Sequence, residues 1–252
     1  MIGFLKTAPV IEPLPASQID PEYKRLRRQV FLGIFVGYAG FYLVRNNLAL
    51  AIPDILKQYP QYSKASLGTA LTGSSIAYGV SKFLMGSVSD RSNPKYFLPL
   101  GLLLSAAIIF ACGTVKGIYA SLAVLVVLQT LNGWVQGMGW PACGKTMVHW
   151  FSTKERGLVV SVWNCAHNVG GGLVASLAAV GLVLFGDWGA KFYFNALVAA
   201  AIAVVALVMM RDTPQSCGLP PVEQYRNDYP PDYSADHERT FTFSQIFFEH
   251  VL

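Results

Sequence analysis

Charged side chains are scarce in this sequence of 252 residues. Lysine, arginine, aspartate and glutamate together make up 13% of it, whereas a soluble domain usually carries about 25%. Hydrophobic residues account for 53% of the chain, and the mean hydropathy is +0.42. This shortage of charge excludes an ordinary soluble domain and indicates an integral membrane protein.

Cysteine is rare as well, and nothing in its spacing indicates chemistry. The four cysteines form no C-x-x-C pair, and three of them lie in apolar runs, where cysteine acts as a small packing residue. We therefore expect neither a disulfide nor a metal site. The sequence also lacks a recognisable pair of nucleophile and base, so an enzyme or a cofactor-binding protein is not expected. The cysteines are Cys112, Cys143, Cys165 and Cys217.

The apolar residues gather in six runs, each long enough for a helix that crosses a hydrocarbon core of about 30 Å. The sequence therefore predicts an all-α membrane protein with a six-helix bundle over residues 30–210. A basic tail, 1–29, precedes the bundle, and residues 211–252, which contain no apolar run, read as a cytoplasmic linker. The expected spans are 30–52, 66–88, 97–115, 118–142, 157–185 and 192–210.

The distribution of positive charge predicts the orientation of these spans. If the N-terminus lies inside, most lysines and arginines fall in inside segments, as the positive-inside rule requires. An even number of spans then places both ends of the chain in the cytoplasm. This distribution also accounts for the net charge of +5 without a nucleic-acid partner. The few basic residues in the outer loops are Lys57, Lys64, Lys116 and Lys191.

No carboxylate lies within the expected spans, although two cations do. All 14 acidic residues fall in tails, loops or helix ends, while Arg45 and Lys82 lie inside apolar runs. An arginine at the centre of a span costs about 2.5 to 3.5 kcal/mol, and buried charges are normally paired. The missing negative charge is most simply a ligand. Phosphate suits it, because arginine offers a planar fork to two oxygens.

Aromatic and imidazole side chains surround these cations in the sequence. Tyr38 and Tyr42 precede Arg45 at helical spacing, i, i+4 and i+7, which predicts one polar helix face. Further candidate site residues are Tyr78, Trp140, Trp163 and His167. The alternative is that both cations snorkel to the bilayer surface and that His167 and Trp140 only pack against other helices.

Two local patterns predict structure rather than chemistry. Ser152-x-x-Glu155, ahead of an apolar run, is typical of a capping box that starts a helix. The glycines, including Gly33-x-x-x-Gly37, are typical of places where two membrane helices approach closely.

Four stretches of the sequence resemble a known family. Residues 86–94 are similar to the inner-loop signature of the major facilitator superfamily. Residues 133–141, 161–172 and 210–221 are more specific. They resemble the organophosphate:phosphate antiporter family within that superfamily. The likeness extends from about residue 14 to the end of the sequence.

The resemblance implies a protein of about twice this length, in which two six-helix bundles enclose a central site. It implies a secondary transporter in the bacterial inner membrane that imports glycerol 3-phosphate in exchange for inorganic phosphate by alternating access. This chain would be the N-terminal half. In the family, an arginine from the first helix of each half grips the phosphate, and Arg45 matches the first of these. The residues that match cavity positions are Tyr38, Tyr42, Tyr78, Lys82, Trp140, Trp163 and His167.

One departure from the family pattern lies beside this arginine. Asn46 stands where the family commonly has lysine, so one cation of the expected site is missing.

A second interpretation is a receptor for a phosphate ester, such as a hexose phosphate, because a transporter fold can also sense its ligand.

Overall fold

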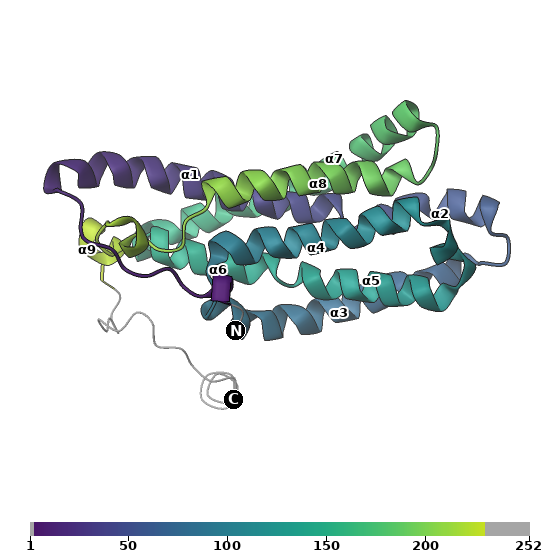
Figure 1. The fold of residues 1–252 in the computed structure, drawn as a ribbon, viewed down its shortest axis with the longest axis horizontal. Coiled ribbons are helices and arrows are strands. Elements are labelled where there is room, and N and C mark those ends of the chain that lie inside the picture. The colour runs from purple at the N-terminus through teal and green to yellow at the C-terminus, as the bar shows by residue number, and fades with distance from the viewer. Residues whose placement is uncertain (1–2, 230–252) are drawn as a thin grey trace.

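Helices make up nearly all of the regular structure in residues 3–229, the part of the chain that the computed structural model describes (Figure 1). The expected linker beyond residue 229 lies outside these described residues. Short 3₁₀ turns lie at Gly3–Leu5, Lys116–Ala120 and Gln215–Cys217. The α-helices are α1 (Ala16–Leu43), α2 (Asn47–Gln58), α3 (Lys64–Asp90), α4 (Pro94–Thr114), α5 (Leu122–Gln136), α6 (Gly139–Trp150), α7 (Thr153–Phe185), α8 (Ala190–Met209) and α9 (Val222–Arg226).

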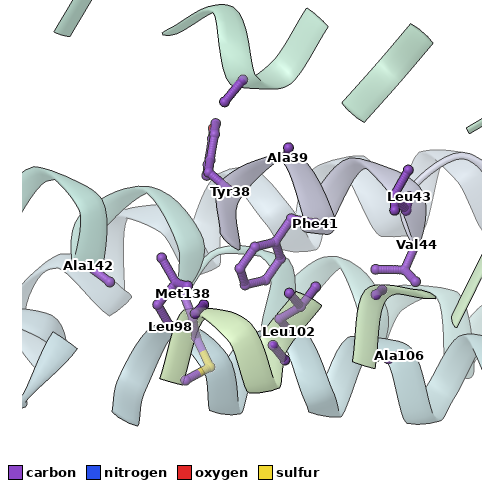
Figure 2. Close-up of a cluster of buried hydrophobic side chains, with 14 of the residues drawn as sticks. Tyr38, Ala39, Phe41, Leu43, Val44, Leu98, Leu102, Ala106, Met138 and Ala142 are labelled. Atoms are coloured by element: carbon purple, nitrogen blue, oxygen red, sulfur yellow. The ribbon is translucent and has the colours of Figure 1, made fainter. Parts of the chain in front are cut away.

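The long helices run side by side along the long axis of the molecule (Figure 1). Helix α1 packs against α7 and α8, α4 packs against α8 and α5, and α3 packs against α5. At the centre, Phe41 of α1 lies among Leu98, Leu102 and Met138 (Figure 2). Since lipid tails are as apolar as these side chains, close van der Waals packing holds such a bundle together.

Four stretches of helix are long and apolar enough to cross a membrane: Pro94–Thr114, Leu122–Trp150, Thr153–Phe185 and Ala190–Met209. They correspond to the third, fourth, fifth and sixth spans expected from the sequence. Helices α1 and α3 are also long, with 28 and 27 residues, but they are not among the four. Helix α1 carries a basic first half, and α3 is rich in serine and glycine. Within residues 3–229, the protein is thus all-α, with four candidate membrane spans.

Two of the expected spans contain a short turn, at residues 44–46 in the first and at residues 137–138 in the fourth. Helix α1 ends at Leu43 and α2 begins at Asn47. Helix α5 ends at Gln136, and α6 begins at Gly139. The prediction of one continuous helix through residues 30–52 is therefore wrong, because the chain leaves the helix after Leu43 in a turn that contains Arg45.

Side-chain amides from α5 explain the first interruption. Asn132 Nδ2 donates to the carbonyl oxygen of Val44 at 3.0 Å, and Gln136 Nε2 donates to that of Phe41 at 3.1 Å. Helix carbonyls that lose their own partners must be satisfied by other groups when they are away from water. The two buried amides supply those donors and permit the break.

Glycines allow the helices around the break to approach closely, as the sequence predicts. A Cβ atom at Gly133 of α5 would overlap the carbonyl oxygen of Ser74 on α3. A Cβ atom at Gly170 of α7 would overlap that of Ala39 on α1. A Cβ atom at Gly37, within the predicted contact pattern, would lie 2.6 Å from Leu98 Cδ2. These contacts fix α3 and α7 beside the middle of α1 and α5.

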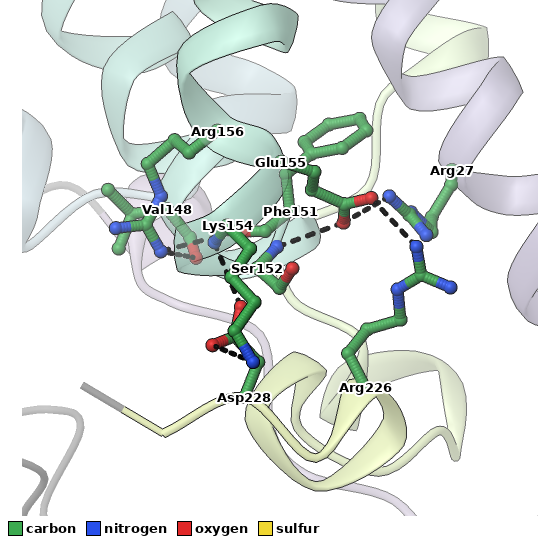
Figure 3. A network of polar contacts seen from close by, with 9 residues as sticks. All are labelled: Arg27, Val148, Phe151, Ser152, Lys154, Glu155, Arg156, Arg226 and Asp228. Carbon is green, nitrogen blue, oxygen red and sulfur yellow. Dashed lines mark hydrogen bonds and ion pairs between the residues drawn. The ribbon is translucent and has the colours of Figure 1, made fainter.

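The start of α7 is an anchoring point for the segment that follows the bundle (Figure 3). Glu155 Oε1 accepts a hydrogen bond from Ser152 N at 3.0 Å, as the predicted capping box requires. The same carboxylate pairs with Arg27 of α1 and with Arg226 of α9. Asp228 Oδ2 accepts from Lys154 N at 2.9 Å. The described part of the expected linker therefore packs against the bundle.

Candidate functional site

Arg45 lies in the turn between α1 and α2, within a cluster of aromatic rings. Its Cζ lies 4.2 Å from the ring centroid of Tyr42 and 4.4 Å from that of Tyr78. Its Nε donates to Gln136 Oε1 at 3.1 Å. Cation–π contacts contribute about 0.5 to 2 kcal/mol each, more where water is excluded. The guanidinium is thus held from α1, α3 and α5 at once.

Lys82 lies one turn beyond Tyr78 on α3 and points into the same cluster. Its Nζ lies 5.7 Å from the ring centroid of Tyr78 and 5.2 Å from that of Trp140, in the first turn of α6. An ammonium group that snorkelled to the bilayer surface would extend along its helix, away from rings of other helices. These contacts therefore favour an inward position for Lys82.

Helix α7 closes the cluster with two further rings. Trp163 lies 4.5 Å from Tyr38 and 6.5 Å from Trp140, measured between ring centroids. His167 lies 5.8 Å from Tyr42 by the same measure. Tyr38 and Tyr42 are themselves in edge contact at 5.7 Å. The structure therefore brings together all eight residues that the sequence nominated, from five segments of the chain.

The cluster contains positive charge and no carboxylate. Within residues 3–229, neither Arg45 nor Lys82 takes part in an ion pair. Arg45 Nη2 is buried and has no hydrogen-bond partner. A buried donor of a charged group that lacks a partner costs a few kcal/mol. A negatively charged oxygen is the group that would complete this arrangement.

A buried polar chain behind Arg45 was not among the residues nominated from the sequence. Gln136 accepts from Arg45 and donates through Nε2 to Ser105 Oγ at 2.9 Å. Ser105 Oγ donates in turn to Asn132 Oδ1. The signal in the sequence is the spacing of Asn132 and Gln136, one helical turn apart in an apolar run. These hydrogen-bonded side chains set the direction in which the Arg45 guanidinium points.

Two nominated residues differ in how far the structure supports them. Trp140 is 43% exposed beside Lys82, which fits the wall of a site better than a packing residue. Trp163 is 1% exposed and also donates from Nε1 to the carbonyl oxygen of Ile34 at 3.3 Å, so it packs the helices as well. Asn46, in place of the lysine common in the family, is exposed. Ligand contacts of the eight residues stay a prediction.

Comparisons with known proteins identify the family of the chain. Residues 33–249 match the Major Facilitator Superfamily. The glycerol-3-phosphate transporter of Bacillus subtilis is 50% identical over the whole of this chain, which covers 56% of that protein. The glycerol-3-phosphate transporter of Haemophilus influenzae is 47% identical, again over the whole chain and 55% of its own length. The membrane sensor protein UhpC of Escherichia coli is 38% identical over 90% of this chain and 51% of its own length.

The chain thus spans about half the length of these relatives. Two of the three are named as transporters and the third as a sensor, and none is an enzyme by name. The family match covers most of the chain, from the middle of α1 to beyond α9. This multi-pass membrane protein belongs to the major facilitator superfamily.

Proposed function

We propose that this chain is the N-terminal half of a secondary transporter that imports glycerol 3-phosphate in exchange for inorganic phosphate. Arg45 and Lys82 would hold the phosphate, with Arg45 giving two parallel donors and Lys82 a point charge. His167 and the tyrosine hydroxyls would donate to the remaining oxygens. The tryptophans Trp140 and Trp163 would form the wall. No reaction on the substrate is involved.

The observation that carries this proposal is the unbalanced charge of the cluster. Arg45 and Lys82 have no ion-pair partner among residues 3–229, and Arg45 Nη2 is a buried donor without an acceptor. A phosphate dianion would satisfy both requirements. The names of the two relatives at 50% and 47% identity favour glycerol 3-phosphate as the ester.

The proposal includes the arrangement of the whole transporter. Helices α1 and α2 together would form one further span and α3 another, which makes six. Both ends of the chain would lie on the cytoplasmic side of a bacterial inner membrane. A second six-helix bundle would face the cluster. The exposed side of α7 supports this, because Val169 and Leu173 lie there beside Gly171 and Gly172, at which a Cβ atom would meet nothing within 4 Å. Small residues of this kind are typical of contacts between membrane helices.

Uptake into vesicles tests exchange directly. The chain would be co-reconstituted with the second half of the Bacillus subtilis relative, in vesicles loaded with phosphate or with chloride. We expect uptake of labelled glycerol 3-phosphate only into the phosphate-loaded vesicles, since exchange needs a counter-substrate. Equal uptake into phosphate-loaded and chloride-loaded vesicles would contradict antiport, but it would still show that the protein is a transporter.

A phosphate-ester sensor, for example of a hexose phosphate, is the second candidate. It is favoured by the similarity to the membrane sensor protein, which is 38% identical over 90% of this chain. Both candidates use the same cluster, so binding alone does not separate them. Saturable binding of the ester without exchange, in vesicles where the Bacillus subtilis transporter itself exchanges, would select the sensor.

A further inference from the structure

A cavity lies between the first half of α1 and the start of α7, away from Arg45 and the cluster around it. Its volume is about 640 Å³. One part of its lining is basic and the rest is apolar. The basic residues are Lys24, Arg27 and Arg28, and the apolar ones are Phe31, Phe151, Leu158, Val159 and Val162.

The two kinds of lining are separated along the helices. The three cations lie within five consecutive residues of α1, immediately before the apolar run that begins at Val30. Phe31 follows one turn further on, and Leu158 and Val162 face it from α7 at helical spacing. The cavity therefore offers positive charge at the level where a membrane span begins and apolar surface at the level of the bilayer interior.

The basic residues are not equally engaged. Arg27 pairs with Glu155, and its Cζ lies 4.9 Å from the ring centroid of Phe151, so it shapes the cavity floor (Figure 3). Lys24 pairs with Asp20 at 2.7 Å, but both side chains are more than half exposed. Arg28 is exposed, donates from Nε to the carbonyl oxygen of Lys24 at 3.2 Å, and takes part in no ion pair within residues 3–229. The terminal nitrogens of Arg28 are therefore available to an anion.

We propose that this cavity binds one anionic phospholipid of the adjoining leaflet. Its phosphate would lie against Arg28 and Lys24, and one acyl chain would lie along Phe31, Leu158 and Val162. Charge complementarity favours this occupant over a zwitterionic lipid, and the apolar lining favours it over a soluble phosphate. The site is separate from the proposed transport site and does not depend on it.

Native mass spectrometry of the detergent-purified chain tests the proposal, with phosphatidylglycerol and phosphatidylcholine of the same acyl chains as probes. We expect adducts with phosphatidylglycerol to exceed those with phosphatidylcholine, and Arg28→Gln to reduce the former about fivefold, as expected for one basic residue at an anionic surface. Arg91→Gln is the matched control, since Arg91 is an exposed arginine after α3 that does not line the cavity. It should leave the adducts unchanged.

A second variant tests the apolar half. Val162→Trp fills the cavity without changing its charge, so it should also reduce the phosphatidylglycerol adducts, with an unchanged circular dichroism spectrum. Three results would overturn the proposal: equal binding of both lipids, equal losses in Arg28→Gln and Arg91→Gln, or displacement of the lipid by excess glycerol 3-phosphate. The last result would assign the cations to a soluble phosphate instead.

Discussion

At the scale of single residues, the proposed phosphate binding depends on the direction of the Arg45 guanidinium. Gln136 uses its amide nitrogen for Phe41 and Ser105, so only its oxygen is left to accept from Arg45 Nε. Tyr42 and Tyr78 hold the guanidinium from two sides. Nη2 is buried without a partner and is left for a ligand.

Replacement of Arg45 by lysine keeps the charge and removes the fork. We expect phosphate affinity to fall by about 1.5 to 3 kcal/mol, the range for a hydrogen bond to a charged group. Equilibrium binding of labelled phosphate measures this, with Arg91→Lys as a control away from the cluster. An affinity close to that of the wild type would show that Arg45 only extends to the bilayer surface.

Gln136→Glu would place a carboxylate beside Arg45 and supply the negative charge that the cluster lacks. Glutamate keeps an acceptor for Arg45 Nε but loses the amide that donates to Phe41 and Ser105, so the variant should also be less stable. Phosphate must then compete with an internal ion pair. We expect affinity to fall at least about tenfold, roughly 1.4 kcal/mol. Thermal unfolding and phosphate binding should be measured on the same preparation. Unchanged binding would mean that Arg45 does not face the phosphate.

At the scale of helices, close contacts position the site. Gly133 brings α5 against the backbone of α3 near Tyr78, and Gly170 brings α7 against the backbone of α1 near Tyr42. A protein interior cannot absorb an added methyl group where a backbone carbonyl lies in its place. Helix spacing and the spacing of the aromatic rings are therefore set by the same residues.

Gly133→Ala should destabilise the bundle by about 1 to 3 kcal/mol, because the methyl group would overlap the carbonyl oxygen of Ser74. Gly79→Ala on α3 is the matched control, since a Cβ atom there would meet nothing within 4 Å. The midpoint of thermal unfolding in detergent compares the two. Equal midpoints would contradict close packing of α3 on α5.

The contact between Asp228 and the start of α7 predicts a dependence on pH. The backbone N–H of Lys154 donates to its carboxylate and holds the pKa of Asp228 below its usual 3.8. A lowered pKa in the folded state contributes stability that is present above pH 3.8 and is lost as pH falls through the folded value.

Asp228→Asn should therefore lower the thermal midpoint near pH 7 and have a smaller effect as the pH falls below 3.8, because the wild-type carboxylate then loses its charge as well. Unfolding curves of both proteins across this range check the expectation. A difference that stays constant with pH would show that the carboxylate charge does not hold the linker.

The sequence predicted the residues of the cluster better than the helices that carry them. Arg45 and Lys82 were recognisable because a charge in an apolar run is costly wherever the chain folds. The break after Leu43 was not, because it depends on amide donors from Asn132 and Gln136, about 90 residues later in the chain. Hydrophobic patterns report burial, whereas such long-range hydrogen bonds depend on the tertiary arrangement.

At the scale of the whole molecule, we propose that the cluster forms one side of a site. It gathers rings and cations from α1, α3, α6 and α7, yet Trp140 is 43% exposed and much of α7 has no neighbour within residues 3–229. Transporters built from repeats work by one bundle rocking against another around a central site. Within residues 3–229, the cluster has a single arginine, Arg45, and no wall opposite it.

Exchange by the chain alone is therefore the most direct test of the account. Residues 1–252 would be reconstituted in phosphate-loaded vesicles, alone and with the second half of the Bacillus subtilis relative, and uptake of labelled glycerol 3-phosphate would be followed. We predict uptake only when both halves are present, and its loss when the chain carries Arg45→Lys and Lys82→Ala. Saturable exchange by residues 1–252 alone would contradict the claim that the cluster is half of a site.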